Sequence, residues 1–148
     1  HMEESHELLA FYGNEKIWDI LAENPRTRVV VFGEQPEMLR FPCSTQSYTD
    51  IEGSGGNFNL SSSPEALADF FTFAGVDYIY LGSGYLKPGT DGFRNVTGLL
   101  KQGYLMDLLY ENGNGLAVFS SDPKNLTEEE SEALLAEFTE KYWPGEQQ

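Results

Sequence analysis

The sequence predicts an α/β domain in which helices cover both faces of a mainly parallel sheet. Helix-like and strand-like segments alternate along the chain, and the first strand-like segment is apolar from Val29 to Phe32, which is typical of a strand buried on both faces. An Asn-Gly pair between the last two strand-like segments favours a closing hairpin. We therefore expect a three-layer α-β-α sandwich whose sheet ends in an antiparallel hairpin.

Length and charge limit the classes of protein that fit. The chain has 148 residues, the size of one ordinary domain. His1-Met2 has the form of a cloning remnant, and residues 3–148 are expected to form a single α/β domain. Asp and Glu outnumber Lys and Arg by 24 to 9, which gives a formal charge of −15. So acidic a chain is not expected to bind nucleic acid or anionic lipid, because cationic groups supply much of the affinity for both.

The spacing of apolar residues and the positions of Gly and Pro predict the elements in order. The segment before residue 52 is more polar than the other strands and is placed near the sheet edge. In chain order we expect helix 4–23, strand 29–33, helix 35–41, strand 45–51, a loop over 52–63, helix 64–74, strand 76–81, a loop over 82–95, helix 96–100, strands 104–110 and 116–121, and a last helix from Thr127 to before Pro144.

Local signals mark the ends of two of these helices. Ser63-Pro64 has the form of an N-cap followed by the first helical residue, and Gly75 has the form of a helix C-terminus. Thr127 and Glu130 have the spacing of a capping box. These signals predict where the chain enters and leaves its helices.

Cysteine and histidine, which enzymes often use for nucleophilic or metal catalysis, are scarce. Cys43 is the only cysteine, and His6 is the only histidine besides His1. We therefore expect no zinc site, no cofactor and no catalytic residue in this chain. A single cysteine cannot form an internal disulfide, which fits a reducing compartment and fits equally those bacterial extracytoplasmic domains that lack disulfides.

Two glycine-rich segments imitate ligand-binding loops. Residues 82–89 have the glycines of a phosphate-binding loop, but Lys87 stands where the third glycine is needed and Pro88 interrupts any helix that would follow. Residues 50–61 alternate acidic and polar side chains like a calcium loop, but Ser61 stands where a bidentate carboxylate is needed. Both segments are expected to be ordinary connecting loops.

Ligands of open α/β sheets bind beyond the carboxyl ends of the strands. The loops in that position after the first and third predicted strands, with one residue near the end of the second strand, supply the candidate binding side chains. Lys87 is one of few cations, suited either to a phosphate or carboxylate of a ligand or to a neighbouring acid of the chain. The candidate ligand-binding residues are Glu34, Asp50, Ser83, Tyr85, Lys87 and Asp91.

The second half of the chain carries a longer pattern. It consists of a helix ending in Ala74-Gly75-Val76-Asp77-Tyr78-Ile79-Tyr80, a short helix leading to Gly103-Tyr104-Leu105, then Leu109-Tyr110-Glu111-Asn112-Gly113 and Leu116-Ala117-Val118-Phe119. Over about 17–121 this resembles the soluble extracytoplasmic domain after the last spans of dolichyl-phosphate-mannose mannosyltransferase-like membrane glycosyltransferases. The long loop at 52–63 and the acidic C-terminal helix depart from the pattern.

The resemblance implies a noncatalytic accessory domain on the extracytoplasmic face of a bacterial membrane, within a larger glycosyltransferase. The catalytic carboxylates of such a protein lie in its membrane portion, so no catalytic residue carries over. Its partners would be the membrane-embedded part of its own parent chain and a glycan or acceptor. The alternative is a free-standing, cytoplasmic protein or enzyme with a Rossmann- or flavodoxin-like sheet that binds a nucleotide or another small molecule.

Overall fold

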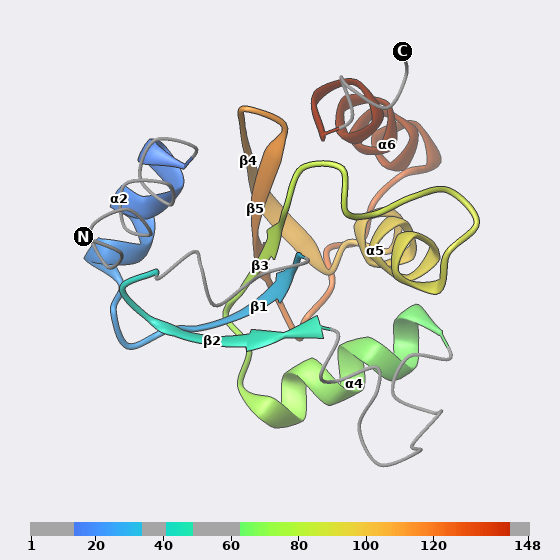
Figure 1. Ribbon diagram of the computed structural model, residues 1–148. Helices are drawn as coiled ribbons and strands as arrows, with labels where there is room; N and C mark the ends of the chain where they lie inside the picture. Colours follow the sequence, from blue (N-terminus) through green and yellow to red (C-terminus); the bar gives the residue numbers. More distant parts are fainter. Residues whose placement is uncertain (1–13, 34–40, 49–62, 143–148) are drawn as a thin grey trace.

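The computed structural model describes residues 14–33, 41–48 and 63–142. Within these residues the chain is mixed α/β, with helices around a five-stranded sheet of order β2-β1-β3-β5-β4 (Figure 1). The described helices are α2 (Glu15–Glu23), α4 (Pro64–Ala74), α5 (Asp91–Lys101) and α6 (Glu128–Tyr142). The strands are β1 (Arg28–Phe32), β2 (Ser44–Ser47), β3 (Tyr78–Leu81), β4 (Leu105–Glu111) and β5 (Asn114–Phe119). No helix in these ranges has both the length and the apolar character that crossing a bilayer needs.

The prediction of an α/β fold is confirmed, but the prediction of a mainly parallel sheet is wrong. β1 pairs in parallel with β2 and β3, whereas β5 pairs antiparallel with both β3 and β4. The closing hairpin therefore supplies an interior strand, because its more buried arm, β5, inserts beside β3 and leaves β4 at the edge. The polar strand β2 lies at the other edge, as its sequence predicts.

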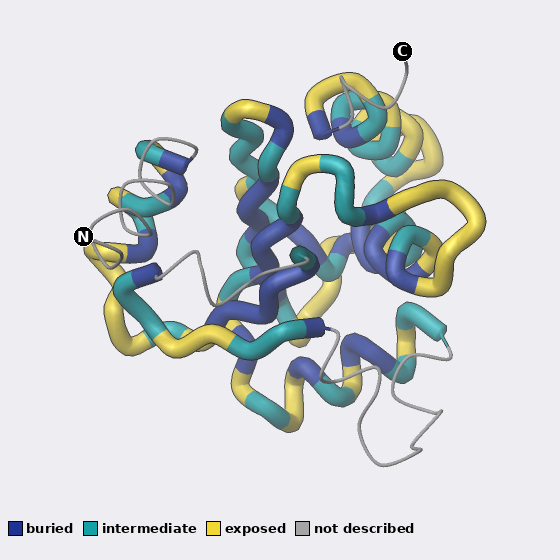
Figure 2. Tube along the Cα trace, viewed as in Figure 1, coloured by how far each residue is buried: buried dark blue, intermediate teal, exposed yellow. Residues whose placement is uncertain are grey.

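Helices contact both faces of the sheet, with the strands between them (Figures 1 and 2). Successive strand residues point to opposite faces. Val30 and Phe32 pack in a core with α4, α5 and α6, whereas Val29 and Val31 pack in a second core with α2. All four side chains have no exposed surface, which confirms that this strand is buried on both faces.

The predicted helix ends around α4 and α6 are confirmed. The Ser63 hydroxyl accepts a hydrogen bond from the Ala66 amide at 3.1 Å, and Gly75 ends α4 at a φ of 70°. The Thr127 amide donates to Glu130 Oε1 at 3.0 Å, and the Glu130 amide donates to Thr127 Oγ1 at 3.1 Å. The N-termini of α4 and α6 thus have acceptors for amides that the helix itself leaves unpaired, and at the C-terminus of α4 the Gly75 amide donates to helix carbonyls.

Helix α5 is longer than the predicted helix 96–100. It begins at Asp91 because the Thr90 hydroxyl caps it, accepting a hydrogen bond from the Phe93 amide at 3.2 Å. Gly98 is unfavourable in a helix, yet it lies inside α5 because Pro64 packs against it: a Cβ at position 98 would lie 2.2 Å from Pro64 Cγ.

Several other predictions extend beyond the described residues. The predicted helix 4–23 is confirmed over Glu15–Glu23, and its first part lies outside those residues. Most of the predicted helix 35–41, the last three residues of strand 45–51 and nearly all of the loop 52–63 also lie outside the described residues.

Candidate functional site

A cavity of about 290 Å³ lies at the carboxyl end of the parallel strands. One lining residue directly follows β2, and the others come from the loop after β3 and the first turn of α5. This is where α/β sheets bind ligands, and the volume is near the lower end of the usual range of about 300–1,000 Å³. The lining residues are Tyr48, Tyr85, Leu86, Thr90, Asp91 and Gly92.

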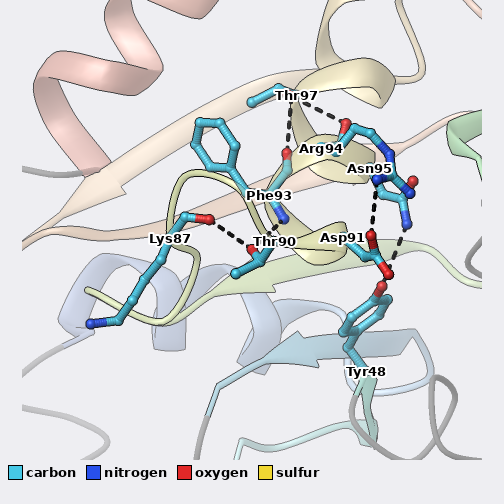
Figure 3. A network of polar contacts seen from close by, with 8 residues as sticks. All are labelled: Tyr48, Lys87, Thr90, Asp91, Phe93, Arg94, Asn95 and Thr97. Carbon is cyan, nitrogen blue, oxygen red and sulfur yellow. Dashed lines mark hydrogen bonds and ion pairs between the residues drawn. The ribbon is translucent and has the colours of Figure 1, made fainter.

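Two of the six predicted site residues line this cavity. Tyr85 is partly buried and packs against the core below it, whereas Asp91 is exposed at the start of α5. Ser83 and Lys87 belong to the same loop but are not among the lining residues, and the Lys87 side chain extends away from Tyr48 and Asp91 (Figure 3). The structure therefore brings together half of the four predicted residues that it describes.

The other two predicted site residues, Glu34 and Asp50, lie outside the described residues. Sequence reasoning missed four lining residues: Tyr48, Leu86, Thr90 and Gly92. Thr90 had a usable signal, since a threonine just before an acidic first turn is a common helix N-cap. No sequence signal pointed to Tyr48, because it lies in the middle of the predicted polar strand 45–51.

The inner wall of the cavity belongs to the packed core. The Tyr48 ring stacks on Phe32 with ring centres 4.3 Å apart, and only 1% of its surface is exposed. Its hydroxyl accepts a hydrogen bond at 3.5 Å from the Asn95 side chain, which is fully buried in α5 (Figure 3). Gly92 lets α5 approach this wall, since a Cβ there would lie 3.2 Å from Leu86 Cδ2.

Groups of the chain itself already interact with the positive N-terminal end of the α5 helix dipole. The Thr90 hydroxyl accepts from the Phe93 amide and donates to the Lys87 carbonyl at 2.7 Å. Asp91 places a carboxylate in the first turn and forms an ion pair with Arg94 at 2.9 Å (Figure 3). A phosphate binding here would compete with both groups for the helix end. The arrangement therefore disfavours an anionic ligand.

The loop after β3 is held by hydrogen bonds to distant elements. The Gly82 amide donates to the Phe32 carbonyl at 2.8 Å, and the Ser83 amide donates to Asn114 Oδ1 at 2.8 Å. The Tyr142 hydroxyl donates to the Gly82 carbonyl and accepts from the Leu86 amide, the latter at 3.0 Å. We expected an ordinary connection here, and the helix does begin only at Asp91, but the backbone is anchored on both sides.

A larger hollow of about 480 Å³ lies beside α6. Among the described residues, it is lined by that helix alone, through Glu132, Leu135, Ala136, Thr139 and Glu140. One helix cannot surround a ligand, whereas the cavity near Tyr48 is formed by segments from different parts of the chain. We therefore take the smaller cavity as the candidate site.

The described residues show little that would support covalent or metal chemistry. Burial raises the pKa of the Cys43 thiol to about 11, so the thiol is protonated near neutral pH and is a poor nucleophile. Within the described ranges, no three His, Cys, Asp or Glu side chains gather in a way that could hold a metal ion.

The chain as a whole matches no protein-family model, no curated protein and no solved structure.

Proposed function

We propose that the domain is noncatalytic and binds a small, uncharged, hydroxyl-rich ligand, such as one sugar unit, in the cavity near Tyr48. The observation that carries the proposal is the combination of a tyrosine ring and a carboxylate around about 290 Å³, supplied by Tyr85 and Asp91. An aromatic ring offers an apolar surface to a sugar ring, and a carboxylate accepts hydrogen bonds from its hydroxyl groups.

Charge favours an uncharged ligand over a nucleotide or a sugar phosphate. The chain carries a formal charge of −15, and Asp91 adds a carboxylate at the cavity itself. The capped start of α5 offers no ready place for a phosphate, and the Lys87 side chain extends away from Tyr48 and Asp91 (Figure 3). A flavodoxin-like nucleotide-binding protein is therefore the second candidate, and the binding experiment below separates the two.

The wider setting that we propose rests on the family resemblance of residues 17–121. The domain would be the extracytoplasmic accessory part of a membrane glycosyltransferase, with helices and sheet in a three-layer α-β-α sandwich. Its partners would be the membrane-embedded part of the same chain and a glycan or acceptor. This proposal predicts that the parent reading frame encodes several hydrophobic spans before Glu3, and a frame without them would remove it.

Binding is tested by NMR titration of the ¹⁵N-labelled chain with methyl α-D-mannopyranoside, and separately with AMP. We expect the mannoside to shift the amide signals of Tyr85, Thr90 and Gly92, with a dissociation constant of about 1–10 mM, since one sugar unit makes few contacts. AMP should leave these signals unchanged. Shifts at the same residues with AMP and none with the mannoside would favour the nucleotide-binding alternative.

Two variants locate the site. Asp91→Asn should weaken mannoside binding about tenfold, because a charged acceptor is replaced by a neutral one. The matched control is Asp69→Asn, which changes an exposed aspartate on α4, away from the lining residues of the cavity. Equal affinities for the two variants would place the sugar elsewhere.

A further inference from the structure

Helix α6 reaches the candidate site through one side chain near its C-terminus. Phe138 and Tyr142 are the buried residues of α6, and their rings stack with centres 5.0 Å apart and planes 8° from parallel. Phe138 also contacts Phe93 of α5, with ring centres 6.3 Å apart. Packing thus fixes the Tyr142 ring and the direction of its hydroxyl.

The Tyr142 hydroxyl bridges two points of the loop after β3. It donates to the Gly82 carbonyl and accepts from the Leu86 amide at 3.0 Å. Leu86 is 1% exposed, and the hydrogen bond from its backbone amide to the Tyr142 hydroxyl is buried. A buried amide that lost this acceptor would carry a desolvation penalty, so the loop conformation between the two points depends on Tyr142.

The bridged segment contributes two walls of the cavity. Tyr85 and Leu86 both line it, and they lie between or at the two points that Tyr142 joins. From this geometry we infer that Tyr142 is a positioning residue of the binding site: its hydroxyl holds Tyr85 and Leu86 in the conformation that shapes the cavity. The expected effect of Tyr142 on ligand affinity rests on the proposed function. The expected effect of Tyr142 on the loop conformation does not.

The test compares Tyr142→Phe with Tyr110→Phe. Both changes remove one tyrosine hydroxyl, and both rings contact the same core: Tyr142 belongs to it, and the partly buried Tyr110 packs against it. They differ in hydrogen bonding, because Tyr110 Oη is buried with no hydrogen-bond partner in the described part of the chain. Tyr110→Phe is thus a matched control that should leave the loop unchanged.

Two measurements are made on both variants and on the wild-type chain. Hydrogen exchange of the Leu86 amide should be roughly tenfold faster or more in Tyr142→Phe and unchanged in Tyr110→Phe, because only the first loses the acceptor. The dissociation constant for methyl α-D-mannopyranoside should rise about tenfold in Tyr142→Phe alone. A purely structural role in α6 would destabilise the helix without this selective change at Leu86.

The outcomes separate the two proposals. If the wild-type chain does not bind the mannoside, the proposed function fails, and the exchange of Leu86 still decides whether Tyr142 positions the loop. If the wild type binds and Tyr142→Phe binds equally well, the positioning role is overturned while the proposed function stands. If Tyr142→Phe does not fold, the wild-type chain decides: an NOE from the Leu86 amide proton to the Tyr142 ring supports the inference, and its absence overturns it.

Discussion

The tip of the β4–β5 hairpin and the loop after β3 meet at one end of the strands, yet they are held in different ways. The hairpin tip is a local structure: Asn112 and Gly113 have φ angles of 54° and 80°, as in the tight turns that Asn-Gly pairs favour. The loop after β3 takes its shape from Phe32, Asn114 and Tyr142, which lie far away in the chain.

This difference separates scaffold from candidate site. The hairpin anchors its surroundings: Asn114 accepts from the loop, and the Glu111 carboxylate accepts from the Lys16 and Ile17 amides at 2.9–3.2 Å, which caps α2 from a distance. The loop, in turn, lines the cavity. A segment without regular structure can therefore offer a defined binding surface when its backbone bonds to rigid neighbours.

The strongest way to disturb both regions is Gly113→Val. Residue 113 has a φ of 80°, and a Cβ there would lie 2.7 Å from Ser83 Oγ, so the change strains the turn and pushes on the loop. We expect a loss of about 2–4 kcal/mol in the free energy of unfolding, measured by urea denaturation.

Gly89→Val is the matched control for the turn. Gly89 has a similar φ of 86°, but a Cβ added at position 89 would meet no neighbouring group within 4 Å. Gly89→Val should lower the free energy of unfolding by about 1–2 kcal/mol, from backbone strain alone. Equal losses for the two variants would show that contact between the hairpin and the loop contributes nothing.

Glu111→Ala tests the hairpin as an anchor for α2. Removing the carboxylate leaves the Lys16 and Ile17 amides without this acceptor, and we expect a loss of about 1–2 kcal/mol in the free energy of unfolding. Hydrogen exchange should increase in α2 and stay unchanged at Leu86. Glu128→Ala, at the exposed start of α6, is the control and should change stability by less than about 0.5 kcal/mol. Faster exchange at both α2 and Leu86 would mean that the two regions are not separate.

The smallest effect is expected at the local capping box of α6. Hydrogen bonds from the Thr127 amide and side chain lower the pKa of Glu130 below its ordinary 4.5. A lowered pKa contributes stability above pH 4.5, and this contribution is lost as the pH falls through the lowered value. Glu130→Gln should therefore reduce the fall in Tm between pH 6 and pH 3, whereas Glu129→Gln should not. An unchanged pH dependence in Glu130→Gln would contradict the assignment.

The features that could be predicted from the sequence are the locally determined ones, and those held by distant contacts could not be predicted. Features set by neighbours in the chain were predictable: the cap at Ser63, the turn at Gly113 and the capping box at Thr127. The position of β5 inside the sheet was not, because the choice of strand partners depends on competition between distant segments for the core.

The candidate site was predictable only in part for the same reason. The rule that ligands bind at the carboxyl ends of strands pointed to Tyr85 and Asp91. It could not point to Tyr142, since nothing local shows that a tyrosine at the end of an acidic helix bonds to a loop about sixty residues earlier. The sequence also does not show why a glycine stands at position 98 inside a helix, because the reason is its contact with Pro64.

The binding site itself is tested most directly by intermolecular NOEs between the wild-type chain and methyl α-D-mannopyranoside. We predict NOEs from the sugar ring protons to the Tyr85 ring, because that ring lines the cavity beside Asp91. NOEs to Leu135 and Thr139 on α6 instead, or none at sugar concentrations up to about 50 mM, would contradict a sugar site at the carboxyl end of the parallel strands.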